Sequence, residues 1–205
     1  MRAGLKVLAL IALALASAGP AAADPREIEA LVPSLPMPGT DFEDIRAFKL
    51  PVDNRLVCDT DQDKPVLAAP KLMAPQAGRT GGRVRRCSVF AAGPAQAWAQ
   101  ATLPTLAGPA RLWLTYVEQG NGGRYRLAQV SLWAKRDSWT VVADRLSAIL
   151  GEPLAGSDRF LSWEDEQHDT LMFIDEKQPD EFAVAVGDIR LRKLLKSPGS
   201  SVHPE

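Results

Sequence analysis

The sequence predicts an α+β domain, in which an antiparallel β-sheet carries one main amphipathic helix on one face and follows a loop-rich, disulfide-closed N-terminal part. Two asymmetries predict this. Of the 16 prolines, 11 lie between Pro25 and Pro109, and proline ends helices and interrupts strand ladders. All five tryptophans lie after residue 97. We therefore expect short elements at residues 24–104 and the main helix-on-sheet core at residues 105–196.

The first 23 residues have the three parts of a secretory signal peptide. Arg2 and Lys6 supply a positive start, residues 7–16 are an unbroken apolar run, and residues 21–23 are three alanines. The apolar run is too short to span a bilayer, which disfavours the alternative of a membrane anchor. We expect cleavage after Ala23, a periplasmic or secreted location, and a mature chain that does not span a membrane.

Export would place the two cysteines, Cys58 and Cys87, in an oxidising compartment. In an oxidising compartment a pair of cysteines usually forms one structural disulfide. The alternative, a redox pair, is disfavoured because the chain has no Cys-x-x-Cys motif. If the strands that hold these two residues pair with each other, the cysteines come within bonding distance.

The N-terminal region 24–104 alternates apolar points with proline, glycine and charged residues. Such a pattern favours brief elements joined by loops. In order, we expect a helix at 25–32, a helical turn at 42–48 capped by Asp41, a strand at 50–58, a loop at 59–82, a strand at 83–90 and a helix at 95–101.

The core region opens with a predicted hairpin of strands 111–118 and 124–134 about a glycine-rich turn. The best helix follows at 139–150, where Trp139, Val142, Ala143, Leu146, Ile149 and Leu150 share one face. Asp137 or Ser138 is expected to cap its start, and Gly151 to end it. After it we expect strands at 160–163, 170–174 and 182–186, a helix or strand at 189–195, and a flexible tail at 197–205.

Charge and composition exclude several classes of function. With 24 basic and 25 acidic residues, the chain lacks the basic excess of a protein that binds nucleic acid through phosphates. Two histidines and two cysteines are too few for a multi-ligand zinc or iron–sulfur site, so no cofactor or metal is expected. No nucleophile elbow, zinc-protease motif or phosphate-binding loop occurs either.

The first candidate site is the acidic turn at residues 164–169, next to Trp163. Glu164, Glu166 and His168 are its candidate binding groups. Paired carboxylates can act as acid and base in glycoside hydrolysis, and oxygen-rich clusters can bind calcium. The simpler interpretation is a solvated hairpin tip. A second acidic run, Asp59, Asp61 and Asp63, begins like a calcium loop, but the pattern fails at its sixth and twelfth positions.

The second candidate site is the basic run of Arg83, Arg85 and Arg86, with Lys71 and Arg79 upstream. Alternation along a strand puts Arg83 and Arg85 on one face and Arg86 on the other. Arginine side chains suit carboxylates and phosphates, although charged strands also simply resist aggregation. The tryptophans offer a further alternative: Trp113 and Trp133 could stack across two strands, either in the core or as an exposed platform.

Together these observations favour an exported, non-enzymatic accessory or binding protein, whose partner is an envelope or extracellular protein or polymer. The alternatives are a small exported hydrolase of glycans or esters, using carboxylates near Trp163, and a module that binds an ion or anion.

Overall fold

The computed structural model of the chain describes residues 36–46, 50, 53–61, 83–92, 98–105, 108–120 and 123–196. The predicted signal peptide, the helix expected at 25–32 and the expected tail at 197–205 lie outside these residues, as do Asp63, Lys71 and Arg79. No helix in the described parts is both long and apolar enough to cross a membrane.

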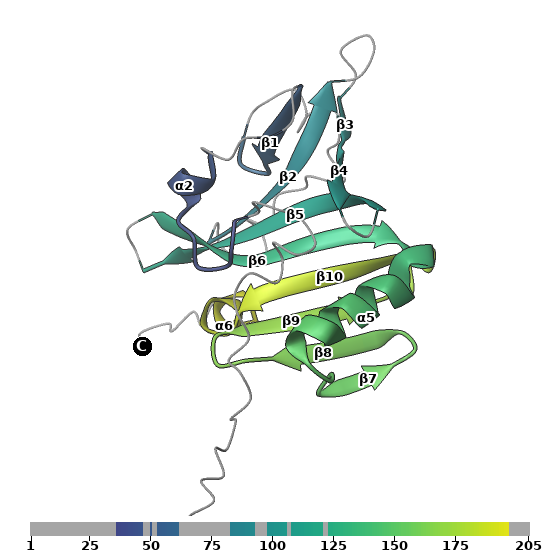
Figure 1. The fold of residues 1–205 in the computed structure, drawn as a ribbon. Helices are drawn as coiled ribbons and strands as arrows, with labels where there is room; N and C mark the ends of the chain where they lie inside the picture. The colour runs from purple at the N-terminus through teal and green to yellow at the C-terminus, as the bar shows by residue number, and fades with distance from the viewer. Residues whose placement is uncertain are drawn as a thin grey trace, which may run out of the picture.

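The fold is mostly one antiparallel β-sheet with a few helices, and the sheet runs through both predicted regions (Figure 1). Its strands follow the order β1-β2-β5-β6-β10-β9-β8-β7, with β3 paired to β2 and β4 paired to β5. The strands are β1 (Asn54–Cys58), β2 (Val84–Ala92), β3 (Trp98–Gln100), β4 (Thr102–Thr105), β5 (Gly108–Gln119), β6 (Arg124–Lys135), β7 (Ala155–Ser157), β8 (Phe160–Glu164), β9 (His168–Phe173) and β10 (Glu181–Asp188).

The helices are α2 (Phe42–Arg46), α5 (Trp139–Leu150) and α6 (Ile189–Lys196), and a 3-10 turn at Arg136–Ser138 precedes α5. The expected helix at 139–150 therefore has the bounds of α5. The segment left open as helix or strand at 189–195 is helical. Helix α5 lies across strands β8, β9 and β10 of the sheet (Figure 1).

The disulfide between Cys58 and Cys87 is confirmed. The two residues face each other in the ladder of β1 and β2, so strand pairing alone brings them together as expected. Both are buried in the hydrophobic core.

The helix expected at 95–101 is wrong, because Trp98–Gln100 form strand β3. The reason lies in β2, which pairs with β5 only from Val84 to Ser88 and then diverges from it. Beyond Ser88, β3 pairs with Phe90–Ala92, and the Ala101 amide donates to the Val89 carbonyl at 2.8 Å. Backbone groups that lose one partner must find another, and here tertiary pairing overrides a helical pattern.

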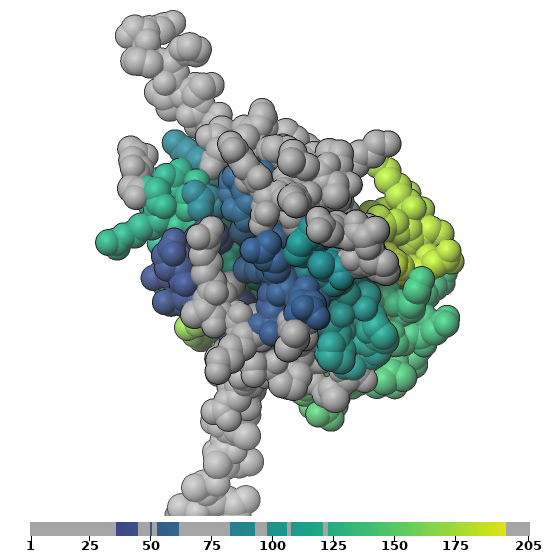
Figure 2. Space-filling view, turned by 90° about the horizontal axis from the view of Figure 1, so that it is seen from above, coloured from purple at the N-terminus to yellow at the C-terminus, as the bar shows by residue number. Residues whose placement is uncertain are grey.

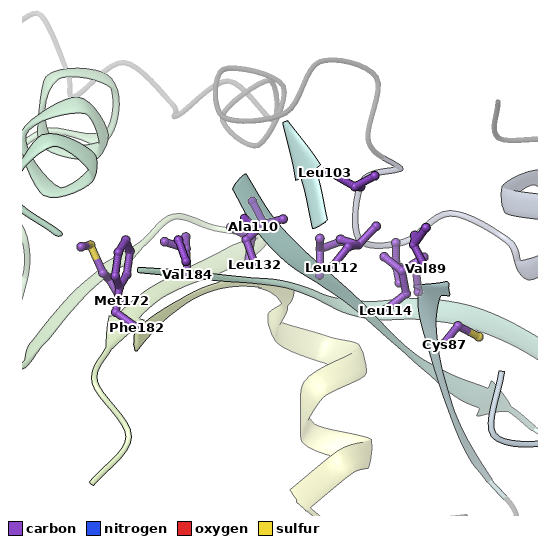
Figure 3. Close-up of a cluster of buried hydrophobic side chains, with 14 of the residues drawn as sticks. Cys87, Val89, Leu103, Ala110, Leu112, Leu114, Leu132, Met172, Phe182 and Val184 are labelled. Atoms are coloured by element: carbon purple, nitrogen blue, oxygen red, sulfur yellow. The ribbon is translucent and has the colours of Figure 1, made fainter. Parts of the chain in front are cut away.

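The main hydrophobic cluster lies on the α5 side of the sheet and draws residues from both regions of the chain (Figure 3). Val142 and Leu146 are the buried residues of α5. Trp139 packs edge to face on Phe182, with ring centroids 5.5 Å apart. Ile149 was expected on this face but is 37% exposed. Leu150, the next residue, packs against the main cluster in its place.

The start of α5 also differs from expectation, since no side chain caps it. The hydroxyl of Ser138 instead donates to the Lys135 carbonyl at 2.8 Å, because the preceding 3-10 turn runs directly into the helix. The end of α5 follows the prediction: Gly151 has a φ of 83°, and its amide donates to the Ser147 carbonyl.

The N-terminal segment is fixed against the end of the β5–β6 hairpin. β10 pairs with β6 only from Gln129 onward, which leaves the first residues of β6 without a neighbour on that side. Residues 39–41 occupy this place: Gly39 donates to the Leu127 carbonyl at 2.7 Å, and Leu127 donates to the Thr40 carbonyl at 2.9 Å. This pairing holds α2, which follows directly, over the hairpin end.

Candidate functional site

Arg85 is the residue of the predicted basic run around which the structure builds a pocket. Its guanidinium lies 3.7 Å from the ring centroid of Tyr125 and 5.2 Å from that of Phe42. Its Nε is buried without a hydrogen-bond partner, and within the described residues no carboxylate forms an ion pair with it. A cation that stacks on one aromatic ring and contacts a second is oriented by them, while its donors remain available to a ligand.

We call the hollow around Arg85 the α2 pocket. It has a volume of about 510 Å³, within the range of small-molecule sites. In Figure 2 the purple atoms of α2 lie beside the green atoms of the hairpin end. The pocket is lined by Asp41, Phe42, Glu43, Asp44, Arg85, Gln119, Gly123, Arg124, Tyr125 and Arg126.

A β-bulge in the hairpin places Tyr125 on the face of the sheet that carries the main hydrophobic cluster. The pairing shifts between Thr115 and Tyr116, so that Ala128 has no partner in β5. Before the shift, odd-numbered residues of β6 such as Leu127 face the main cluster, and after it even-numbered ones such as Val130 do. Tyr125 consequently packs on the same side as Tyr116.

Tyr116 packs edge to face against Phe42, with ring centroids 5.0 Å apart and an interplanar angle of 86°. Its side chain is fully buried, and its hydroxyl has no hydrogen-bond partner among the residues that the structure describes. Burial raises the pKa of the Tyr116 phenol above its ordinary value, because the phenolate cannot be solvated there.

We expect Tyr116→Phe to raise the free energy of unfolding by about 1 kcal/mol at pH 7, because it removes an unpaired buried hydroxyl. The raised pKa adds a pH dependence. The contribution of the neutral phenol is complete below about pH 10 and is lost as pH rises, since only the unfolded chain ionises there. The variant should therefore lose less stability than the native chain between pH 9 and pH 11.

Urea unfolding across that pH range measures both effects. Tyr125→Phe is the matched control, because it removes a hydroxyl from a half-buried ring. A Tyr116→Phe variant less stable than the native chain at pH 7 would mean that the hydroxyl makes a stabilising hydrogen bond.

The other two predicted arginines lie outside the α2 pocket. Arg83 is exposed just before β2. Arg86 faces the opposite side of the sheet, with its guanidinium 4.4 Å from the ring centroid of Trp113. Burial lowers the pKa of Arg86, and the charge of Asp59 opposes that shift. The strand alternation of Arg85 and Arg86 is thus as expected, and it separates the basic run into unlike environments.

Asp59 and Asp61 serve the backbone around the disulfide. The Arg86 amide donates to Asp59 Oδ1 at 3.1 Å, and the Cys58 amide donates to Asp61 Oδ2 at 2.9 Å. Through these bonds the carboxylates of Asp59 and Asp61 hold the end of β1 in place beside β2. Among the described residues, no group of three or more His, Cys, Asp or Glu side chains is arranged to hold a metal ion.

The predicted acidic site also forms a pocket, between the end of α5 and the β8–β9 hairpin. It holds about 90 Å³ and brings Trp163, Glu164 and His168 together, whereas Glu166 is exposed outside its lining. We call this hollow the acidic pocket. It is lined by Leu150, Glu152, Leu154, Trp163, Glu164, Asp165, His168 and Thr170.

Two groups in the acidic pocket are engaged in local structure. Trp163 is 4% exposed, and its indole nitrogen donates to the Gly151 carbonyl at 2.9 Å. Asp165 closes the turn by accepting the amides of Gln167 and His168 at 2.6 and 2.7 Å. The Asp165 carboxylate is also 3.7 Å from His168 Nδ1. The pocket is small beside the 300–1,000 Å³ typical of ligand sites.

Trp113 and Trp133 lie on facing strands but are not directly opposite. Trp113 pairs with Ser131, and Arg111 pairs with Trp133, so the two indoles are offset by two residues. Trp133 instead packs edge to face on Phe173, with centroids 6.0 Å apart. With Trp113 only 7% exposed, this face of the sheet does not present it as an open platform.

Sequence reasoning singled out Arg85 but missed the rest of the α2 pocket. Phe42, Tyr125 and the charged residues beside them come from segments whose meeting depends on the pairing of residues 39–41 with β6. One signal was available in the sequence: Arg124-Tyr125-Arg126 directly follows the hairpin turn, which concentrates two cations and an aromatic ring at a sheet end.

Comparison with known proteins identifies no relative of this chain. The chain matches no protein-family model, and neither the curated proteins nor the solved structures include a match to it.

Proposed function

We propose that this chain is exported to the periplasm or secreted, and that it binds an envelope or extracellular component without chemically changing it. The signal-like N-terminus supports export. A buried disulfide and the finding that no helix of the described parts could span a membrane fit this location.

The binding function is assigned to the α2 pocket, and the observation that carries it is Arg85. A guanidinium that stacks on Tyr125 and contacts Phe42, with a buried Nε that has no partner among the described residues, costs desolvation energy that the described fold does not recover. A ligand with an anionic oxygen group would recover it through charge-assisted hydrogen bonds. We therefore infer that the bound component presents such a group.

The acidic pocket gives less support to the hydrolase alternative than the α2 pocket gives to the binding proposal. Its volume of about 90 Å³ is well below that of a site for a sugar ring or an ester with its flanking groups. Asp165, one of its carboxylates, is already engaged by two backbone amides.

Native mass spectrometry of the exported chain tests the proposal. The full chain is expressed in an exporting host, and the product is equilibrated with envelope extract at low salt. We expect a mature mass that starts at Asp24 and a bound component that Arg85→Met loses. Arg83→Met, which removes an exposed arginine outside the pocket, is expected to retain it.

Two results would contradict the proposal. A product that keeps residues 1–23 after export would refute cleavage at the predicted site. The same bound components on all three proteins, or none on any, would refute binding through Arg85.

A further inference from the structure

The charges that line the α2 pocket narrow the class of ligand, and this step rests on the proposed function of that site. Among the described residues the lining contains three arginines and three carboxylates, so the formal charge of this described lining is zero. Two of these groups already form an ion pair: Arg126 Nε lies 3.1 Å from Asp41 Oδ1. Two positive charges, those of Arg85 and Arg124, and two negative charges, those of Glu43 and Asp44, then remain.

These four remaining charges do not neutralise one another within the described structure. No ion pair joins Arg85 or Arg124 to Glu43 or Asp44 there. The two carboxylates are exposed on α2, whereas Arg85 is held in place on β2 by stacking on Tyr125. The pocket therefore presents negative charge from α2 and positive charge from β2 and β6.

A ligand with charge of only one sign fits this lining poorly. A polyanion would bring negative charge to Glu43 and Asp44, and a polyamine would bring positive charge to Arg85 and Arg124. Juxtaposition of like charges lowers affinity, whereas a ligand with both signs can pair with the carboxylates of α2 and with the arginines of β2 and β6.

We propose that the α2 pocket binds a small zwitterion, whose anionic oxygen group pairs with Arg85 and whose ammonium group pairs with Glu43 and Asp44. The volume of about 510 Å³ suits a ligand of this size. The rings of Phe42 and Tyr125 provide apolar contact for the carbon atoms between the two charges. A short peptide with free ends and a phosphoethanolamine headgroup both have this chemistry.

Isothermal titration of the full chain at low salt tests the proposal with two pairs of probes. The first pair is dialanine and N-acetyl-dialanine, and the second is O-phosphoethanolamine and its N-acetyl derivative. We expect the free amine of at least one pair to bind about tenfold tighter than its acetylated form. The pair that shows this preference identifies the source of the anionic group.

Variants locate the preference. Glu43→Gln combined with Asp44→Asn should abolish the difference between free and acetylated probes, and Arg85→Met should weaken both forms. Glu166→Gln and Arg83→Met are matched controls that alter exposed charges outside the pocket, and they should leave the titrations unchanged.

The two levels of inference fail in different ways. Acetylated probes that bind through Arg85 as tightly as free amines would overturn the zwitterion and leave anion binding standing. Failure of every probe to bind the native chain would also overturn the zwitterion. If, in addition, Arg85→Met retains every component captured from envelope extract, the proposed function fails with it.

Discussion

Replacing both Cys58 and Cys87 by alanine is expected to lower the free energy of unfolding by about 3.5 kcal/mol, among the largest effects of any change in this chain. The disulfide joins residues 29 positions apart, so it removes a large loop-closure entropy from the unfolded ensemble. In the folded chain it ends the β1–β2 ladder, where the Asp59 amide donates to the Arg86 carbonyl at 2.8 Å. Without the disulfide, this end of the ladder depends on those backbone bonds and on the carboxylates of Asp59 and Asp61.

Thermal unfolding measures the effect. For a domain of this size, 1 kcal/mol corresponds to roughly 3 °C, so we expect the melting temperature to fall by about 10 °C. Reduction of the native protein under mild denaturation should give the same decrease, and the double variant should not respond to reductant. Equal melting temperatures for the oxidised native chain and the double variant would show that the disulfide does not stabilise this fold.

The elements that sequence alone predicted are those whose signals are local. The pairing of Cys58 with Cys87 follows from two short strand patterns and the number of cysteines. Helix α5 follows from the periodicity of its apolar residues and from Gly151. The hairpin of β5 and β6 follows from β-branched and aromatic runs on both sides of a glycine-rich turn. In each, local propensity agrees with the tertiary structure.

The elements that sequence missed depend on partners far along the chain. Strand β3 exists because β2 leaves β5 after Ser88, and nothing within Trp98–Gln100 shows that divergence. Strand β7 is three exposed residues paired only with β8. Strand β4 contains a proline and pairs with the start of β5. Short elements of this kind carry too little periodicity to separate them from loops.

The candidate site shows the same division. Arg85 was identified from its residue type and its place in a strand, and Arg86 was correctly expected on the opposite face. Their environments could not be predicted, because the bulge at Ala128 decides which β6 side chains join Tyr116. A single skipped residue reverses the face of every side chain beyond it. The aromatic partner of Arg85 is therefore a consequence of sheet register, which no local pattern records.

Phe182→Ala is expected to cost about 3–5 kcal/mol in the free energy of unfolding. Phe182 is 1% exposed and lies in β10, between β6 and β9. Its ring packs edge to face on Trp139 and lines the same small hollow as Val142, so it joins α5 to the sheet. Truncation removes the aromatic contact and leaves a cavity that the ladders on both sides of β10 prevent from collapsing.

Urea unfolding followed by tryptophan fluorescence measures this cost, because all five tryptophans, Trp139 among them, lie in helices and strands of this fold. Phe182→Leu refills most of the volume and should cost about 1–2 kcal/mol, which keeps the comparison possible if the alanine variant does not fold. Phe160→Ala is the matched control: the same truncation at a residue that is 38% exposed should cost about 1 kcal/mol or less. Equal losses at Phe160 and Phe182 would contradict the conclusion that α5 is held to the sheet through Phe182.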